Sequence, residues 1–378
     1  MHIVFYSVVL NHHQAPVADE LYKILGSNYI FVETSNLHDM KGATDDYSKR
    51  PYLLQAWKDE ESKKKAFDLA SSADVCIFGG NDSLPFLKER MKLGLLSFQI
   101  GERWLKRGWI NLLSPNLLRF LKEYHLNKWN SKPLYKLCAS AYTAADDYKL
   151  GFYKGKCYKW GYFTNINEGN HISEQSINSN SHIVKIMWCA RFLKLKHPEI
   201  VVKLAHKLKV LGYNFKINFY GDGDEKQNCI SLAENLRVLD VVDFKGNVPN
   251  HQVLNEMYQH DIFLFTSDKN EGWGAVMNES MSCGCVPVAS HDIGSVPYLI
   301  KDGVNGMIFE TCNLDSLVEK VIYLLENPEQ RKNMALKAKE TIYNIWSPEN
   351  AAKCLLKLIG DIQNNRVCSI MCGPGSKA

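Results

Sequence analysis

Short apolar runs alternate with amphipathic stretches through the first part of the chain. The apolar runs predict strands, and the stretches between them carry apolar positions at a helical spacing. The predicted strands are 2–10, 29–34, 74–80, 95–100, 134–140 and 157–163, and the predicted helices are 17–25, 60–71, 83–93 and about 142–151. This alternation favours a parallel, doubly wound sheet.

A change in composition separates this first series from a second one. Residues 164–181 contain five Asn and four Ser with few large apolar residues, which is typical of a linker. The second series predicts strands at 183–190, 215–220 and 241–245, and helices at 198–211, 225–237, 313–326 and 329–344. Residues 261–306 complete the second sheet with a strand, a loop, a helix, a strand, a turn and a strand, in that order.

The last part of the chain predicts one more helix followed by a tail. Ser347 is a good N-cap and Pro348 suits the first helical position, so a helix is expected over 347–365. The tail from Cys368 to Ala378 is expected to be disordered.

The loop after Phe265 has the composition of a ligand-binding turn. Gly272, Gly274 and Ala275 are small and stand where a helix is about to begin, so backbone N–H groups there can come close to a ligand. Free N–H groups at a helix N-terminus favour an anion such as phosphate. The backbone of 273–276 is therefore the predicted phosphate contact.

Two carboxylates flank this turn. Glu271 precedes the helix and Glu279 lies within it, eight residues further on. That separation suits recognition of hydroxyl groups at two points along an extended ligand better than a shared-proton pair. The alternative from this spacing alone is two solvated glutamates on a surface helix.

Length and composition limit the class of protein. A chain of 378 residues predicts two domains, and 46% hydrophobic with 23% charged residues is ordinary for a globular protein. No apolar run approaches a membrane span, and no basic leader precedes the first apolar run. Eleven cysteines without C-x-x-C pairs indicate reduced, buried thiols. A cytoplasmic protein is expected.

Residues 88–136 form a basic segment. They hold eleven Lys or Arg against three Glu, a formal charge of +8, although the whole chain carries only +4. Trp104, Trp109 and Trp129 are interleaved with these charges. Such a segment favours contact with an anionic membrane surface, and the alternative is a solvated face over core aromatics. No nucleic acid-binding module is recognisable, so nucleic acid is not an expected partner.

The order of motifs over 261–306 resembles a known family. An apolar strand, Ser267, E-G-x-G, E-x-M-x-C-G-x-x-P-V and D-G-x-N-G stand in sequence. This pattern resembles the donor-binding core of retaining glycosyltransferases of the GT-B fold, of the family 4 (group 1) type. The resemblance implies two Rossmann-like domains that face a cleft. They would be an acceptor-side domain over 1–165 and a nucleotide-sugar domain over 182–346, with helix 347–365 packed back on the first.

The resemblance also implies roles for single residues. Arg191 and Lys196 have the five-residue spacing of the family's pyrophosphate-binding pair, and would stabilise charge on the leaving phosphate. Glu279 would bind ribose hydroxyls and Glu271 the donor sugar. The remaining expected donor contacts are Gly221, Asn247, Val248, Gly272, Trp273, Gly274, Ala275 and Val276.

Two loops depart from the family's pattern. His12 and His13 follow the first strand, where paired glycines are common in the family, and are expected to contact the donor. Glu102 and Arg103 follow strand 95–100, where relatives often have a histidine, and are expected to contact acceptor or sugar. Both assignments depend on position at the carboxyl end of a strand.

No metal ion or other cofactor is expected. Asp222 and Asp224 form the Asp-Gly-Asp pattern that could hold a divalent cation, but the pair lies in a tight strand-to-helix turn. The family resembled has G-x-G there and needs no metal.

The resemblance implies transfer of a hexose-type sugar, with retention, from a nucleotide-sugar to a glycan or lipid-linked glycan, and this is the predicted function. The setting would be polysaccharide, lipopolysaccharide or capsule synthesis at the inner face of the cell membrane. Two alternatives stay open: a non-catalytic glycan- or membrane-binding protein of the same fold, and a nucleotide-dependent oxidoreductase. The second lacks a G-x-G-x-x-G after either first strand.

Overall fold

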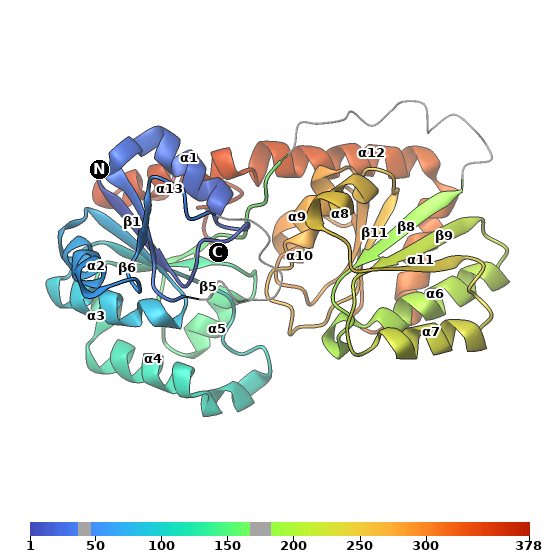
Figure 1. Cartoon of the computed structure of the whole chain (residues 1–378), viewed down its shortest axis with the longest axis horizontal. Helices are drawn as coiled ribbons and strands as arrows, with labels where there is room; N and C mark the ends of the chain where they lie inside the picture. Colours follow the sequence, from blue (N-terminus) through green and yellow to red (C-terminus); the bar gives the residue numbers. More distant parts are fainter. Residues whose placement is uncertain (37–46, 167–182) are drawn as a thin grey trace. The chain divides into compact units, whose positions relative to one another are not determined.

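The computed structural model describes residues 1–36, 47–166 and 183–378, and these form two compact units (Figure 1). Unit 1 contains Met1–Asn165 together with Trp346–Ala378, and unit 2 contains Ile166–Ile345. Each unit is built around one parallel sheet with helices on its faces. The two sheets confirm the predicted α/β class with two Rossmann-like domains. The predicted linker lies almost entirely outside the described residues.

The sheet of unit 1 has seven strands, all parallel, in the order β3-β2-β1-β4-β5-β6-β7. The strands are β1 (Ile3–Ser7), β2 (Tyr29–Glu33), β3 (Leu53–Gln55), β4 (Val75–Gly79), β5 (Ser97–Gly101), β6 (Leu134–Cys138) and β7 (Cys157–Lys159). The strands β1 and β4 are buried along their whole length, because helices cover both faces of the sheet. The short β3 was not predicted, and β7 ends four residues before the expected strand does.

The helices of unit 1 come from both ends of the chain. They are α1 (Ala15–Leu25), α2 (Glu60–Ser72), α3 (Leu84–Leu93), α4 (Pro115–Leu126), α5 (Thr143–Lys149) and α13 (Pro348–Gln363). Helix α13 packs against α1. It begins as predicted, with Pro348 in the first turn and the Ser347 hydroxyl accepting a hydrogen bond from Asn350 N–H at 3.2 Å. Helix α4, inside the basic segment, was not predicted.

A fully buried arginine joins three elements of unit 1. Arg90 on α3 donates hydrogen bonds to the carbonyl oxygens of Ala70 and Ala73 at 2.9 Å each, at the end of α2. It also donates to Asp74 and Leu96 carbonyls, just before β4 and β5. Five N–H donors in a rigid fork suit this multiple role, which a lysine could not fill. Arg90 therefore does not belong to the basic surface, contrary to its place in the predicted segment.

The predicted disorder of the tail is wrong. Residues after α13 return to the free edge of β7, where Lys159 N–H donates to Ser376 O at 2.7 Å and Gly375 N–H donates to Lys159 O at 2.8 Å. Ala378 N–H also donates to Cys157 O at 3.2 Å. An edge strand offers unpaired backbone groups, and the tail satisfies them without needing an apolar sequence of its own.

The sheet of unit 2 has six parallel strands in the order β10-β9-β8-β11-β12-β13. The strands are β8 (Val184–Cys189), β9 (Phe215–Tyr220), β10 (Val242–Gly246), β11 (Ile262–Phe265), β12 (Val286–Ser290) and β13 (Met307–Phe309). The helices are α6 (Pro198–Val210), α7 (Lys226–Asn235), α8 (Asn250–Met257), α9 (Val276–Ser282), α10 (Val296–Leu299), α11 (Leu314–Glu326) and α12 (Pro328–Glu340). Of these, α8 and the short α10 were not predicted. No helix among the described residues is long and apolar enough to cross a membrane.

Candidate functional site

The strand order of unit 2 places two of the predicted site loops next to each other. From β8 the chain proceeds outward to β9 and β10, and later resumes on the other side of β8 with β11. The loop after β8 leads toward β9 and the loop after β11 leads toward β12, so the two neighbouring loops run to opposite sides at this point of the sheet. Ligands of open α/β sheets bind at such a position.

The loop after β11 is shaped by a contact that only glycine permits. Gly274 has φ of +76°, and a Cβ atom there would lie 2.1 Å from the ring of Phe265. Trp273 beside it is fully buried, and its Nε1–H donates to Asn278 Oδ1 at 2.8 Å. The side chain of Trp273 therefore anchors the loop in the core, and only its backbone is left for the predicted donor contact. Gly272, Ala275 and Val276 lie in the same turn and at the start of α9.

An ion pair joins the loops after β8 and β11. Lys196 Nζ contacts Glu271 Oε2, and both side chains are 14% exposed. Ser267 Oγ donates to the same carboxylate oxygen at 3.0 Å. The backbone of Lys196 is held as well, since its carbonyl accepts a hydrogen bond from Thr266 Oγ1 at 2.6 Å. Two residues predicted independently to act on the ligand are thus in direct contact.

Arg191 lies at the start of the loop after β8. Its side chain is exposed and has no hydrogen-bond or ion-pair partner among the described residues. The loop itself is fixed by close backbone contacts, because a Cβ on Gly221 would lie 2.0 Å from Ala190 O and one on Gly223 2.6 Å from Phe192 O. Gly221 therefore supports the position of Arg191, which leaves the guanidinium available to an anion.

Glu279 is a buried carboxylate on α9, 8% exposed. Burial raises the pKa of Glu279 to about 7, and a hydrogen bond with Asn250 on α8 opposes the shift. Burial raises the pKa of Cys189, the last residue of β8, and the nearby Glu279 carboxylate adds to that shift, so Glu279 lies close to the end of that strand. A carboxylate so poor in partners can accept hydrogen bonds from hydroxyl groups of a ligand.

The Asp-Gly-Asp turn uses its first carboxylate internally. Asp222 Oδ1 accepts the N–H of Gly223 at 2.8 Å, and Oδ2 faces Lys226 Nζ at 3.3 Å. These two contacts, the backbone N–H first, lower the pKa of Asp222. Asp222 and Asp224 are both exposed and do not converge with a third ligand into a group that could hold a metal ion, within the described residues.

Two of the expected donor contacts, Asn247 and Val248, follow β10. Gly246 ends that strand with φ of +75°, and its carbonyl accepts the Gly221 N–H at 2.7 Å. Asn247 is exposed and Val248 is half-buried in the next turn. Both therefore stand at the same edge of the sheet as the loops described above.

The predicted residues of unit 1 are held by internal contacts. His13 stacks on Tyr162 with 5.8 Å between ring centroids, and burial, with a smaller contribution from His12, lowers the pKa of His13 to about 3. Its Nδ1 atom is buried and has no hydrogen-bond partner in the part of the chain that the structure describes. His12 precedes it in the same turn, 3.7 Å away between ring centroids. Neutral imidazoles of this kind can donate or accept one hydrogen bond but bring no charge to a phosphate.

The charges of Glu102 and Arg103 are already paired. Arg103 forms a two-point contact with Asp146, at 2.9 and 3.1 Å, and Glu102 accepts from Lys106 at 2.6 Å. The Tyr162 hydroxyl donates to Glu102 as well, at 3.1 Å. Arg103 therefore orders the loop after β5 in this structure.

Sequence reasoning missed His197, which follows Lys196. Its φ is +48°, unusual for a residue with a side chain, and its ring lies 3.2 Å from both Glu199 Oε1 and Asp268 Oδ2. Those two hydrogen bonds raise the pKa of His197, although burial opposes them. The residue links the loop of Lys196 to the loop of Glu271. The only sequence feature that could have indicated His197 is its position between Lys196 and Pro198.

The pKa of Glu279 generates a prediction about stability. The folded state retains a proton on Glu279 between pH 4.5 and about 7 that the unfolded state releases, so the free energy of unfolding of unit 2 falls as the pH rises through this window. Glu279→Gln should therefore increase that free energy by about 1 kcal/mol at pH 5 and about 3 kcal/mol at pH 8. Denaturant titrations at both pH values measure it, with the exposed Glu234→Gln on α7 as control. An equal effect at the two pH values would contradict the prediction.

Comparison with known proteins agrees with this arrangement. Residues 171–341 match the family described as Glycosyl transferases group 1. The chain is 31% identical over 160 residues to N-acetyl-alpha-D-glucosaminyl L-malate synthase of Bacillus anthracis, which is 42% of this chain and 41% of that protein. It is 25% identical over 170 residues to poly(ribitol-phosphate) alpha-N-acetylglucosaminyltransferase of Staphylococcus aureus, 45% of this chain and 34% of the relative. The chain thus spans less than half the length of these two curated relatives.

The whole chain is similar to solved glycosyltransferase structures. The structure of Anabaena Alr3699/HepE in complex with UDP superposes with a TM-score of 0.71 at 14% identity, over 96% of this chain and 100% of that one. A glycosyltransferase from Rickettsia africae superposes with a TM-score of 0.69 at 16% identity, over 96% and 99%. At these identities the likeness concerns the fold. The predicted resemblance is confirmed: this chain has the GT-B fold, and its residues 171–341 match the glycosyl transferases group 1 family.

Proposed function

We propose that this protein is a retaining glycosyltransferase that moves a sugar from a nucleotide-sugar to a glycan or lipid-linked glycan. One observation carries the proposal. Lys196 and Glu271 meet where the loops after β8 and β11 diverge, with the unpaired Arg191 on one of these loops. The family match of residues 171–341 covers this part of the chain and supports it.

Several groups of the proposed donor site bind the nucleotide-sugar. Glu279, buried and poor in partners, accepts hydrogen bonds from the ribose hydroxyls. The backbone of 273–276 contacts phosphate, and Asn247 with Val248 lines the base. A uridine diphosphate sugar is the first donor to test, because the Alr3699/HepE structures were determined with UDP and with UDP-glucose.

The proposed chemistry depends on fixed positive charge. As the bond between the sugar's anomeric carbon and the phosphate oxygen breaks, negative charge grows on the leaving phosphate. Lys196 and Arg191 stabilise that charge more in the transition state than in the ground state. The acceptor oxygen bonds to the anomeric carbon, and the leaving phosphate oxygen takes the acceptor's proton. Glu271 orients Lys196 and contacts the donor sugar.

The proposed acceptor lies at an anionic membrane surface. The 3-10 helix η3 (Gly108–Leu113) and α4 expose large apolar side chains, namely Trp109, Ile110, Leu113, Leu118 and Leu126. Exposed basic side chains stand among them: Arg107, Arg119, Lys122 and Lys128. Arg90 and Lys136 are buried and contribute nothing to this surface, but the remaining mixture suits a lipid headgroup boundary.

Donor binding and chemistry should respond to different substitutions. Glu279→Ala should raise the donor dissociation constant at least tenfold, since each hydrogen bond to a carboxylate contributes about 1.5–3 kcal/mol. Lys196→Ala should lower kcat and kcat/KM together, because Lys196 acts on charge that develops during the reaction. Calorimetry with UDP and steady-state kinetics measure the two effects. The exposed neighbour Lys194→Ala is the matched control, and unchanged nucleotide binding in Glu279→Ala would remove Glu279 from the site.

Turnover should not require a divalent cation, because lysine, arginine and backbone N–H groups supply the positive charge. Release of nucleoside diphosphate from UDP-, GDP- and ADP-sugars, measured with excess EDTA, tests this. Activity with one of these donors should persist, and Asp222→Asn with Asp224→Asn should retain it. Complete loss that magnesium or manganese restores would instead make this turn a metal site. No release from any donor would favour the non-catalytic alternative.

Membrane binding should depend on the exposed side chains of η3. Each Lys or Arg near an anionic surface contributes about 1 kcal/mol, an attraction that salt screens, and buried apolar groups add to it. The chain should sediment with anionic vesicles, bind zwitterionic ones weakly, and be released by high salt. Replacing Trp109, Ile110 and Leu113 by Ser should reduce binding at least tenfold without changing donor hydrolysis.

The matched control for that variant removes exposed apolar side chains elsewhere. Val210 and Leu211, 71% and 58% exposed in unit 2, can be replaced by Ser. This control should bind vesicles like the parent. If the parent chain bound neutral and anionic vesicles equally, or bound neither, η3 and α4 would be an ordinary solvent-exposed surface and the proposal would be wrong.

A further inference from the structure

A buried carboxylate in unit 1 lacks the partners that such a group needs. Asp147 on α5 is completely buried, and neither of its carboxylate oxygens has a hydrogen-bond partner among the described residues. A carboxylate removed from water without hydrogen bonds or a counter-ion is costly. The proposed glycosyl transfer makes no use of this residue. The surroundings of Asp147 must therefore offer another partner for its carboxylate.

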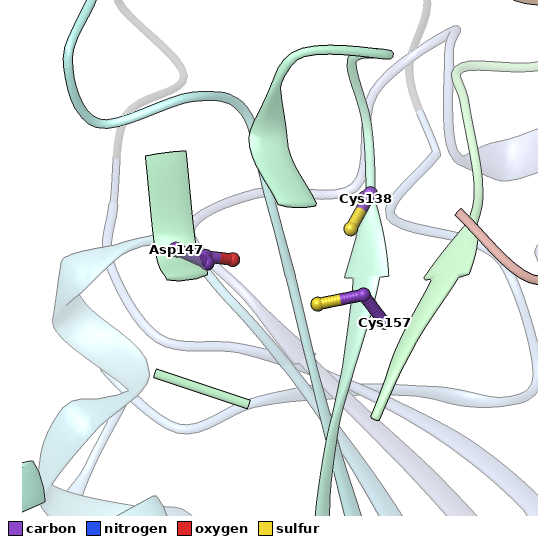
Figure 2. A group of neighbouring side chains, drawn as sticks. All are labelled: Cys138, Asp147 and Cys157. Carbon is purple, nitrogen blue, oxygen red and sulfur yellow. The ribbon is translucent and has the colours of Figure 1, made fainter. Parts of the chain in front are cut away.

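Two thiols face this carboxylate. Cys138 is the last residue of β6 and Cys157 the first of β7, and both are completely buried. One ligand atom from each of Cys138, Asp147 and Cys157 can be chosen so that all three lie within 4.8 Å of one another. Figure 2 shows the three side chains converging from the helix and the two strands on one space. Cys157 Sγ otherwise has a weak contact, 3.8 Å from Tyr153 O.

The nearby lysine does not satisfy Asp147. Lys136 on β6 is buried, but its ammonium donates to Gln99 Oε1 at 3.1 Å and lies 5.6 Å from the centre of the Tyr153 ring. It contributes positive charge to the region without a hydrogen bond to the carboxylate. Packing alone explains two buried thiols, but not an unpaired carboxylate aimed at them.

We propose that Cys138, Asp147 and Cys157 bind one thiophilic divalent cation of the zinc class. Two thiolates and one carboxylate carry three negative charges, and a divalent cation with Lys136 carries three positive ones, so the buried group becomes neutral. Thiolate and carboxylate are ordinary zinc ligands. Tetrahedral coordination would bring the ligand atoms to about 3.5–3.8 Å apart, a contraction of about 1.3 Å at most.

The cation would act as a structural tie. It would fasten α5 to the ends of β6 and β7, the edge at which the tail pairs with Cys157 and Lys159. Three protein ligands leave one position for water or for the Tyr148 hydroxyl, which interacts with the Cys157 thiol. Because the ligands come together only in the folded chain, binding of the ion would stabilise unit 1. This site is independent of the proposed transfer, which uses no metal.

Metal content of the full chain tests the proposal directly. Tag-free protein purified from zinc-supplemented medium should contain about one zinc per chain by elemental mass spectrometry. After removal of zinc, Co²⁺ should produce the intense absorption of cobalt–thiolate bonds, saturating at one equivalent. Zinc should also raise the unfolding temperature of unit 1. Zinc content far below one per chain together with no cobalt–thiolate absorption from the wild-type chain would overturn the proposal, whatever the variants do.

Variants assign the ligands. Cys157→Ser should abolish the cobalt–thiolate absorption, and Asp147→Asn should weaken Co²⁺ binding at least tenfold. Cys76→Ser is the matched control. Cys76 is a buried thiol on β4 of the same sheet, and β4 pairs with β1 and β5 but not with β6 or β7, which carry the two proposed cysteine ligands. An absorption that survives in Cys157→Ser, or disappears in Cys76→Ser, would place the metal elsewhere and contradict the assignment.

Discussion

The candidate donor site depends on three glycines whose backbone lies in direct contact with a neighbouring carbonyl oxygen or aromatic ring. Gly221 and Gly223 lie directly against the carbonyl oxygens of Ala190 and Phe192, and Gly274 lies against the ring of Phe265. A methyl group at any of the three would collide at 2.0–2.6 Å. The first two contacts hold the loop after β9 against the loop after β8, and the third holds the loop after β11 against the end of its own strand. The ion pair of Lys196 and Glu271 has its geometry because the loops beneath it cannot move apart.

Most of the fold was predictable because buried parallel strands are continuous apolar runs, and a few helices, such as α2, α11 and α13, begin at a side-chain cap. The helix starting at Pro348 is one example. The failures share a cause: a segment stabilised by distant partners has no local signal. The tail pairs with β7 through backbone groups, which any sequence can offer. Arg90 is as polar as any surface arginine, and only the carbonyl oxygens around it make it a core residue.

The candidate site divides in the same way. Glu271 and Lys196 stand in recognisable motifs, and the sheet topology then brings them together. Sequence spacing did not indicate that Arg103 is held by Asp146, 43 residues later, or that Asn250 reaches Glu279 from another helix. Ion pairs and hydrogen bonds between distant residues decide whether a charged side chain is free for a ligand. They depend on packing of whole elements, which local patterns do not encode.

Unit 1 is assembled from both ends of the chain, so it cannot finish folding until the whole chain has been synthesised. The apolar side chains of α13, Leu355, Leu358 and Ile359 among them, are completely buried in the finished unit. The ribosome must make all of unit 2 before α13 exists, a delay of roughly 10–40 s at ordinary rates of synthesis. During that interval α1 lacks the helix that packs against it, whereas unit 2 can close as soon as it emerges. The nascent N-terminal half is then the part that a chaperone would have to shield.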